Sequence, residues 1–345
     1  MTDIKPETVR LVSRKTGEER EFVLRPFRCG DEEAVLQCVK EEYGDTYYRR
    51  EYYDRDLLLE QTESGKLHLF MAYCGDDVCG IQSLISYAPK EPRIEAASQI
   101  FRKEYRGYGL PYELVKYTYA MAKSLHPSCI YASMVIFHDI TQKMCEDAGM
   151  KPVAFNFGSH ITSKMHNSFR LGTSEKYGQA IMVLPVDKKD AGCVYIHPDI
   201  KDPVSRIYDD LGVSYVIEDH APSDKDDNPK SELSVAINER EQSISITVHA
   251  IGADLGEKIR QVKSSHSGQL WTIQLILPTD SARAISAYEE LADEGFFFVG
   301  VRPLCANVEQ IFMQYIGDVH LCFDDFVLTD GFKKLLEDVR KYGKQ

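Results

Sequence analysis

The chain has 345 residues, which at roughly 100–200 residues per domain predicts two domains and a sizeable buried core. Hydrophobic residue types account for 43% of the sequence and charged types for 28%, which excludes a disordered chain and a fibrous protein. The 54 aspartates and glutamates exceed the 41 lysines and arginines, and the net charge of −13 argues against nucleic-acid binding and favours a cationic substrate.

The first half of the sequence alternates predicted strands and helices. The run 22–24 predicts a short strand, and a helix is predicted from the N-cap Asp31 to Gly44, because apolar residues recur at helical spacing between them. Two strand-like runs at 67–74 and 78–87 flank a turn sequence and predict an antiparallel hairpin. The other elements predicted in this half are a strand at 93–101, a helix at 110–125, a strand at 130–137, a short helix at 139–148 ended by Gly149, and strands at 153–157 and 181–186.

The segment 43–53 carries five tyrosines among arginines and acids. It is too polar for a core helix and too aromatic for a solvated tail, so one interpretation is a helix and loop that border a groove. The alternative is that the tyrosine rings pack on the neighbouring sheet with their hydroxyls in water.

The second half repeats the order of the first. It begins with a strand at 193–196, a helix at 202–211 and a strand at 213–217, and the polar run 223–231 predicts an exposed connection. The elements predicted beyond it are strands at 233–237 and 244–251, a helix to about 262, a strand at 270–277, a helix at 281–294, strands at 296–301 and 310–316, and a helix at 331–342. Since each half ends a helix with a glycine directly before a strand, we infer an internal duplication.

A glycine loop lies between the predicted strand 93–101 and the helix that follows it. The sequence from Arg106 reads Arg-Gly-Tyr-Gly-Leu-Pro. Glycines at a helix N-terminus expose backbone N–H groups, and the helix dipole favours an anion there, so the loop predicts a phosphate site. The corresponding helix start in the second half, 251–255, has one glycine and Asp254, whose charge repels anions. Only the first half is therefore expected to bind phosphate.

The string of strand, loop 106–109, helix, strand and short helix resembles the GNAT superfamily of N-acetyltransferases, whose loop pattern is Arg/Gln-x-x-Gly-x-Gly/Ala. Arg106, Gly109 and Pro111 occupy those places, and Pro111 departs from the last of them. The resemblance covers about residues 20–187, and the second half looks like a degenerate copy. It implies an α/β fold with a mixed sheet, built from two GNAT-like units in tandem, residues 1–187 and 188–345.

The resemblance also implies a site for acetyl-CoA as cosubstrate, between two central strands. Pantetheine would pair with the backbone of Gln99, Ile100 and Phe101. The residues implied for the phosphates are Arg106, Gly107, Tyr108, Gly109 and Leu110, with further contacts from His138, Asp139, Thr141 and Gln142 at the start of the short helix. Asp139 and Gln142 are also spaced as a helix-capping pair, so helix initiation is an alternative explanation for both.

Acetyl transfer to an amine needs a base for the ammonium proton and donors for the developing oxyanion. The resemblance implies a strand glutamate as base, and Glu95 is the available residue. Its parity matches that of Gln99 and Phe101, so all three are expected to face the same way. The alternative is an exposed strand glutamate without a catalytic role. Cys145 stands where the family has a tyrosine that protonates the leaving thiolate. Substitutes are Tyr105, Tyr108 or a tyrosine of segment 43–53, and the sequence does not choose between them.

The expected function is acetyl-CoA-dependent N-acetyltransfer to a primary amine, on a small cationic molecule or on a peptide lysine, with the second unit walling the acceptor pocket. Two alternatives stay open: a non-catalytic acyl-CoA-binding sensor, which Cys145 and Pro111 motivate, and an α/β scaffold without a CoA site. No nucleic acid or membrane partner is expected, and a homodimer stays open.

Other motifs exclude further classes. The nine cysteines contain no Cys-x-x-Cys pair, so no zinc or other metal site is expected and the thiols suit a reducing cytosol. Neither a secretory signal nor an apolar run long enough to span a bilayer is found, which predicts a cytosolic protein. Zinc hydrolases, serine hydrolases and nucleotide hydrolases lack their motifs. His160 and His166, near Lys164 and Arg170, are read as part of a polar loop, either a pocket rim or a solvated face.

Overall fold

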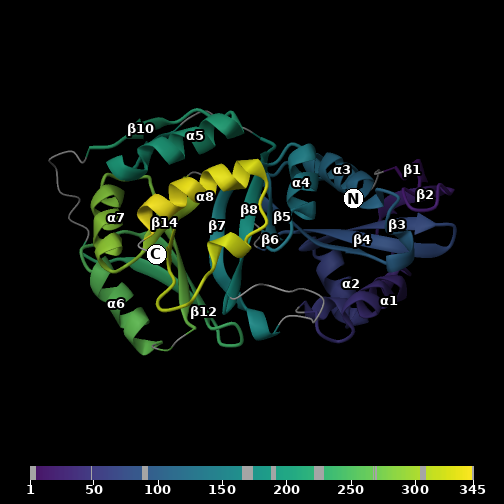
Figure 1. Cartoon of the computed structure of the whole chain (residues 1–345), viewed down its shortest axis with the longest axis horizontal. Helices are drawn as coiled ribbons and strands as arrows, with labels where there is room; N and C mark the ends of the chain where they lie inside the picture. Colours follow the sequence, from purple (N-terminus) through teal and green to yellow (C-terminus); the bar gives the residue numbers. More distant parts are fainter. Residues whose placement is uncertain are drawn as a thin grey trace. The chain divides into compact units, whose positions relative to one another are not determined.

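The structure is a computed structural model that describes residues 5–47, 49–87, 92–164, 174–187, 192–220, 229–266, 268, 270–303 and 308–343 (Figure 1). The chain forms two compact units that meet between Ala132 and Ser133. This boundary differs from the expected one near residue 187. The reason is that the strands at 151–161 and 176–185 pair with each other, and the first of them also pairs with a C-terminal strand through Ala154 and Gly300.

The first unit contains a mixed sheet. Its strands, in spatial order, are β1 (Glu7–Val12), β2 (Glu19–Pro26), β3 (Leu67–Cys74), β4 (Asp77–Ile85), β5 (Arg93–Phe101) and the first residues of β6 (Cys129–Val135). Each neighbouring pair is antiparallel except β5 and β6, which are parallel. The hairpin predicted around Gly75 is confirmed as β3 and β4. Strand β1 was not predicted, although Val9 and Leu11 alternate with Thr8 and Arg10.

Helices cover both faces of this sheet. Helices α1 (Glu32–Tyr43) and α2 (Arg55–Glu63) lie on one face, and α3 (Leu110–Ala122) lies on the other (Figure 1). The prediction for α1 is confirmed, and Gly44 ends it with a φ of 58°, a left-handed conformation that glycine adopts without strain. Helix α2 was not predicted. Its N-cap Asp54 accepts hydrogen bonds from the backbone of Asp56 and Leu57.

The core of the first unit fills the space between α1, α2 and strands β3–β5. Its buried side chains are Val35, Cys38, Val39, Tyr52, Leu58, Leu67, Leu69, Met71, Val78, Ile81, Ile85 and Ile100. Tyr52 is fully buried, and burial raises its pKa to about 12. At least this tyrosine of segment 43–53 therefore packs on the sheet.

The second unit also contains paired strands of mixed direction. The strands in spatial order are β8 (Lys176–Pro185), β7 (Lys151–Ile161), β14 (Phe297–Arg302), β15 (Gln310–Tyr315), β13 (Thr272–Pro278), β12 (Ser243–Ala250) and β11 (Glu232–Asn238). Only β12 and β13 are parallel among these neighbours. Two short strands, β9 (Cys193–Tyr195) and β10 (Val216–Glu218), pair in parallel as a separate small sheet.

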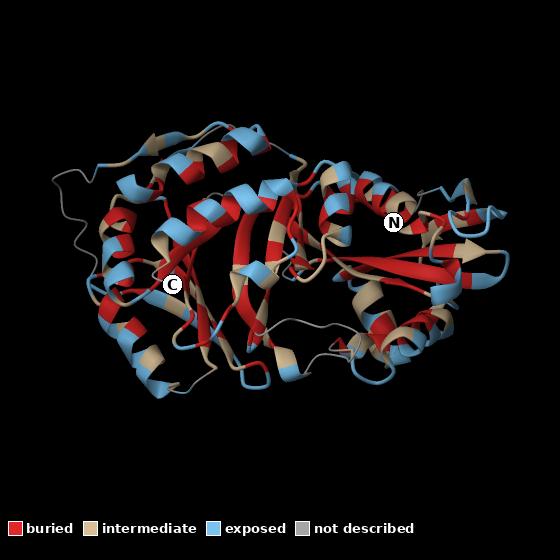
Figure 2. Ribbon diagram, in the orientation of Figure 1, coloured by how far each residue is buried: buried red, intermediate tan, exposed pale blue. Residues whose placement is uncertain are grey.

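The helices of the second unit are α4 (Ile140–Asp147), α5 (Lys201–Leu211), α6 (Leu255–Ser265), α7 (Arg283–Asp293) and α8 (Asp330–Tyr342). Helices α5 and α8 both pack against β7 and β14, and α6 packs against α7. Figure 2 shows that α8 is amphipathic, with buried residues toward the sheet and exposed residues outward. Phe332 and Val339 are among the side chains that it buries.

The two units share one succession of elements. In the first, the hairpin β4–β5 leads into α3 and then into β6, which pairs in parallel with β5. In the second, the hairpin β11–β12 leads into α6 and then into β13, which pairs in parallel with β12. These are the segments in which the sequence predicts a duplication.

Candidate functional site

The loop before α3 exposes a run of backbone amides. Gly107 has a φ of 100° and Gly109 a φ of 78°, and Gly109 is the N-cap of α3. In the described part of the chain, the four amides of residues 107–110 donate no hydrogen bond to a protein acceptor. Consecutive amides that end at a helix N-terminus form a concave anion site, strengthened by the helix dipole. The loop has the geometry that the sequence predicts for phosphate.

Strand β5 bulges shortly before this loop. Ala97 pairs with Ser83 and Ile100 pairs with Ile81, so β5 has one more residue than β4 between these pairs. Ser98, inside the bulge, has a φ of 52°. On the other side of β5, the ladder with β6 begins at Arg93 and ends at Glu95. The backbone of β5 after Glu95 is therefore outside the parallel ladder, where two central strands separate.

The bulge overturns one expectation about side-chain direction. An extra residue reverses the alternation of a strand. Glu95 lies on the α1 face, together with Ile100. Gln99 donates to the side chain of Gln82 and to the backbone of Pro111 in α3, so it lies on the α3 face. Phe101 pairs with Gly80 and also lies on the α3 face. Glu95 therefore faces away from Gln99 and Phe101.

Glu95 is held in a polar cluster rather than exposed. Its side chain is 13% exposed, and its Oε2 lies 3.1 Å from Nη2 of Arg49. The hydroxyl of Tyr87 donates to the same oxygen. Glu51 lies 3.7 Å from the other end of the Arg49 guanidinium. The interpretation as an exposed strand glutamate is therefore wrong, and two donors share the carboxylate.

The tyrosine segment lies along β5. The hydroxyl of Tyr47 donates to Ser98 Oγ over 3.0 Å, and the Tyr47 ring lies 4.7 Å from that of Tyr43 and 5.8 Å from that of Tyr52. Tyr53 donates to the carbonyl of Gly44 over 2.8 Å. These contacts, with the ion pair of Arg49, bring the segment beside the bulge and Glu95. Tyr48 lies outside the described residues.

Arg106, beside the loop, is exposed to solvent and forms an ion pair within the first unit. Its guanidinium is 2.6 Å from Glu42 in α1, and it also donates to the carbonyl of Phe101. Glu42 and Phe101 O therefore hold this guanidinium beside the loop, and its role toward phosphate stays a prediction. Lys15 was missed by the sequence analysis: its side chain lies against Gly107, and the neighbouring Arg14 amide donates to Gly107 O over 3.0 Å. Lys15 lies in the turn between β1 and β2, far from the loop in sequence, so its place beside Gly107 is visible only in the folded chain.

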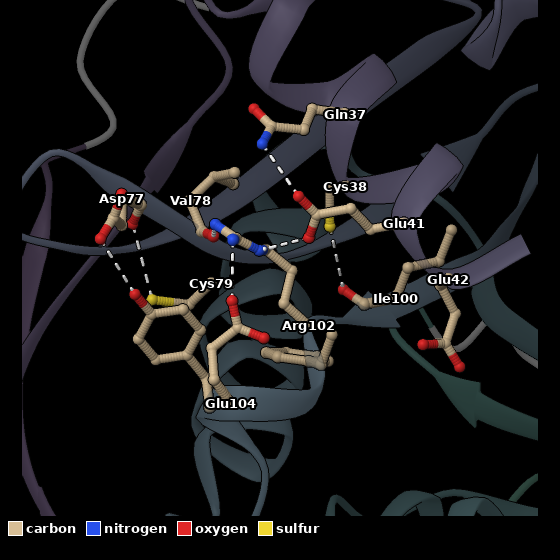
Figure 3. A network of polar contacts seen from close by, with 12 residues as sticks. Gln37, Cys38, Glu41, Glu42, Asp77, Val78, Cys79, Ile100, Arg102 and Glu104 are labelled. Carbon is tan, nitrogen blue, oxygen red and sulfur yellow. Dashed lines mark hydrogen bonds and ion pairs between the residues drawn. The ribbon is translucent and has the colours of Figure 1, made fainter. Parts of the chain in front are cut away.

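Arg102, just before the loop, anchors it to the sheet and to α1 (Figure 3). Its Nε lies 2.7 Å from Glu41, its Nη2 lies 2.7 Å from Glu104, and its Nη1 donates to Val78 O over 3.2 Å. Cys38 lies in the same view, and burial raises the pKa of its thiol to about 12. This network positions the loop and offers no reactive thiolate.

The other candidates in the first unit have buried side chains, so each can contribute only its main chain. These residues are Ile100, Phe101, Tyr108 and Leu110, with exposures of 2%, 7%, 7% and 0%. Tyr108 donates to Glu18 over 3.0 Å and Tyr105 donates to Asp77 over 3.3 Å. Burial raises the pKa of Tyr105 to about 12. Both hydroxyls are thus bonded to carboxylates within the fold.

His138, Gln142 and Cys145 belong to the second unit. Gln142 is fully buried, and its amide donates to the carbonyls of Val135, His138 and Val327 while its oxygen accepts from Thr329 N. These bonds fix the start of α4 to the C-terminal segment and occupy this side chain within the fold, so its implied cofactor contact stays a prediction. The side-chain oxygen of Gln142 accepts from Thr329 N and not from a backbone amide at the start of α4.

The expected capping pair is also absent. Asp139 takes the N-cap position of α4 without a side-chain cap and pairs instead with Lys143 at 2.5 Å. Burial lowers the pKa of His138, and its ring meets that of Phe137 edge-on at 5.1 Å. Cys145 is 3% exposed, so its thiol is packed in the core.

The corresponding helix start in the second unit is filled by the chain itself. Ser231 donates its amide to Asp254 over 2.6 Å, and Gly252 donates to Ser231 Oγ over 2.9 Å. A Cβ at Gly252 would lie 2.2 Å from the backbone of Lys230. Lys258 adds an ion pair with Asp254 at 3.2 Å. This helix start therefore has a carboxylate and a protein segment where α3 has open amides.

His160 lies in strand β7 rather than in a loop. Its ring stacks on that of Tyr177 at 4.8 Å, its Nδ1 lies 2.8 Å from Ser159 Oγ, and burial lowers its pKa. His166 and Arg170, with most of the connection 223–231, lie outside the described residues. No group of three metal-ligating side chains and no helix able to cross a membrane occurs in the described part of the chain.

No protein-family model and no curated protein matches this chain. Solved structures of N-acetyltransferases are similar to about half of it. The N-acetyltransferase from Staphylococcus aureus Mu50 is 14% identical with a TM-score of 0.39, and the match covers 48% of this chain and 98% of that one. A variant of the spermidine N-acetyltransferase from Vibrio cholerae is 13% identical with a TM-score of 0.40, covering 48% and 93%. The ribosomal-protein-S18-alanine N-acetyltransferase from Escherichia coli is 9% identical with a TM-score of 0.38, covering 49% and 96%.

Proposed function

We propose that the first unit binds acetyl-CoA and that the protein is an acetyl-CoA-dependent N-acetyltransferase. The observation that carries this proposal is the run of four amides at 107–110 without protein acceptors, at the N-terminus of α3. A pyrophosphate supplies the acceptors that these amides lack. Lys15, beside Gly107, adds a positive charge at the same place. The side chain of Arg106 donates a hydrogen bond to Phe101 O and so fixes the loop to the end of β5.

The main chain of β5 suits the pantetheine arm. The parallel ladder with β6 ends at Glu95, and the bulge at Ser98 turns the following backbone. An extended amide chain can hydrogen-bond to a strand that has left its ladder, as an added strand does. The thioester carbonyl would then lie beside the bulge, where main-chain amides are the candidate donors to the developing oxyanion.

The polar cluster beside the bulge favours a cationic acceptor. Two carboxylates, Glu51 and Glu95, meet one guanidinium, that of Arg49, so the local charge is one negative unit. Tyr47 adds an aromatic face next to the bulge. Acids and aromatic faces attract an ammonium group, so we assign a primary amine on a small cation or on a peptide lysine.

In direct transfer the amine nitrogen bonds to the acetyl carbon, the carbon–sulfur bond breaks, and the ammonium proton passes to a base. Glu95 is the proposed base, acting on the amine or through one water. Of the candidates for the proton that the leaving thiolate takes up, Tyr105 and Tyr108 are bonded to carboxylates and Cys145 is buried, which leaves a tyrosine of segment 43–53.

We further propose that the second unit is a degenerate copy of the first, in tandem. The shared succession of hairpin, helix and parallel strand supports the duplication. The contact of Ser231 with Asp254 supports the loss of anion binding in the copy. In this view only one acetyl-CoA binds per chain.

A second candidate function is a non-catalytic acyl-CoA sensor. The observation that favours it is the engagement of the Glu95 carboxylate by both Arg49 and Tyr87. Both donors occupy the oxygen that a base would use to accept the ammonium proton.

Release of CoA separates the two functions. Purified full-length protein is incubated with acetyl-CoA and a panel of polyamines and lysine peptides, and free thiol is measured over time. Amine-dependent thiol release supports the transferase. Binding of acetyl-CoA without release from any amine favours the sensor. Absence of both binding and release overturns the acetyl-CoA site itself.

A further inference from the structure

The second unit contains a polar cavity that the proposed acetyl-CoA site does not use. It has a volume of about 250 Å³ and lies between the end of β7 and the strands β11, β12 and β13. The polar side chains that line it on β7, β12 and β13 are Asn156, Ser159, Ser243, Ser245, Thr272 and Gln274. Ala236, Ile237 and Asn238 of β11 form another wall. All of its lining side chains are uncharged.

A bulge in β7 builds one wall of the cavity. The register between β7 and β8 shifts between Asn156 and His160, and Gly158 there has a φ of 61°. Thr272 Oγ1 donates to Gly158 O over 2.9 Å, which fixes the bulge against β13. A Cβ at Gly158 would lie 2.9 Å from the Thr272 methyl group, so only glycine fits. Bulges of this kind re-aim side chains, here Asn156 and Ser159, and are enriched near binding sites.

A buried lysine supports one wall of the cavity, because its ammonium donates to Thr272 Oγ1 over 3.2 Å. Lys176 is fully buried, and its ammonium donates to Glu241 O over 2.8 Å, Gln242 O over 3.0 Å and Leu270 O over 3.0 Å. These carbonyls belong to the turn before β12 and the segment before β13. Gln242 has a φ of 48°, which a non-glycine residue keeps only when its surroundings impose it.

The wall on β12 and β13 is a ladder of neutral polar side chains on one sheet face. Ser243 pairs with Thr272, and Ser245 pairs with Gln274. Residues paired across neighbouring strands project to the same face. The opposite face of the same strands is apolar and buried, as at Ile246. The polar face therefore has an ordered set of hydroxyl and amide groups.

One of these groups is buried without a partner. The Nε2 of Gln274 is shielded from solvent, and no acceptor for it occurs among the described residues. A buried donor left without an acceptor is costly, so such groups mark sites that a ligand or water completes. Gln274 is one of the residues that line the cavity, so this donor belongs to the cavity wall.

We propose that this cavity binds a neutral polyhydroxylated molecule of monosaccharide size. Hydroxyl groups both donate and accept, as do the serine, threonine and amide side chains of the wall. The absence of charge in the lining disfavours ionic ligands, which need compensation when they are desolvated. At ~30 Å³ per water, the volume equals that of about eight waters, which suits one sugar ring. This proposal is independent of the acetyl-CoA site.

The test is a titration of full-length protein, without acetyl-CoA, with glucose, galactose, ribose and myo-inositol, followed by calorimetry and ligand-observed NMR. Ala236→Phe fills the exposed wall on β11. Val235→Phe is the matched control, because Val235 is an exposed neighbour on the opposite face of the same strand. Gln274→Leu removes the unpartnered donor.

The expected result is binding of at least one of these probes, weakened at least about tenfold by Ala236→Phe and by Gln274→Leu, and retained in Val235→Phe. Thermal unfolding of each variant shows whether it is folded, and Ala236→Phe carries the test if Gln274→Leu does not fold. The proposal is overturned if no probe binds, or if Ala236→Phe and Val235→Phe bind equally. Binding of acetamide in place of every polyol would also overturn the assigned ligand class.

Discussion

Replacing Gly109 by aspartate separates the phosphate role of the loop from its role in the fold. Gly109 has a φ of 78°, where a residue with a Cβ costs about 1–2 kcal/mol. No atom lies within 4 Å of a Cβ built there, so there is no steric penalty beyond this backbone cost. Gly75, in the turn between β3 and β4, has a φ of 60° and the same open surroundings, which makes Gly75→Asp the matched control. Both variants are expected to lose similar free energies of unfolding.

The two variants differ in the surroundings of the new carboxylate. At Gly109 it lies among amides expected to hold a pyrophosphate, and two like charges about 4 Å apart near a protein surface repel by about 4 kcal/mol before salt screening. A third of that energy corresponds to about tenfold in affinity. Gly109→Asp is therefore expected to weaken acetyl-CoA binding at least about tenfold, and Gly109→Ala only by the smaller backbone effect.

The assay is calorimetric titration of acetyl-CoA into each folded variant, with urea unfolding to measure stability. Gly75→Asp is expected to bind like the unaltered protein. The reasoning is refuted if Gly109→Asp binds acetyl-CoA as tightly as Gly75→Asp does, because the amides at 107–110 would then not hold the phosphates.

Three further predictions concern single residues. Glu95→Gln should lower amine-dependent CoA release most near neutral pH, and an unchanged pH profile would remove Glu95 as the base. Lys176→Met leaves three backbone carbonyls without their donor, so the free energy of unfolding in urea should fall by at least about 2 kcal/mol. The exposed control Lys116→Met should lose about 0.5 kcal/mol or less. Equal losses in the two variants would contradict the role of Lys176. Burial lowers the pKa of His68, so the unfolded state takes up the proton first and stability falls as pH drops below about 6.5, by up to about 1.4 kcal/mol per pH unit. His68→Gln should flatten this fall, and an unaltered slope of unfolding free energy against pH would exclude His68 as its source.

Local signals were sufficient for most of the fold. Helix α1 has apolar residues at helical spacing and a terminal glycine, and the β3–β4 hairpin has its turn sequence, so both were predicted; Asp31 takes the N-cap position of α1 without a side-chain cap. Strand β1 and helix α2 are short and polar. They are stabilised by neighbours distant in sequence, such as the Arg10–Glu21 pair across β1 and β2. The N-cap Asp54 is a local signal for α2 that the sequence analysis did not use.

The part of the candidate site that glycines define was predicted from the sequence. The parts that depend on contacts between distant residues were missed. The open amides before α3 follow from Gly107 and Gly109. The reversal of side-chain direction after Glu95 follows from Ser98, and a serine with positive φ leaves no mark in the sequence. The amide of Gln142 is used by partners 185 and 187 residues away, which no local spacing can reveal.

The central claim is that the loop before α3 binds the phosphates of acetyl-CoA. Its most direct test compares two titrations of the unaltered full-length protein, one with acetyl-CoA and one with S-acetylpantetheine, which has the same thioester arm but no phosphate. The account predicts one-to-one micromolar binding of acetyl-CoA, and binding of S-acetylpantetheine at least about tenfold weaker. Equal affinities, or no binding of acetyl-CoA, would contradict it.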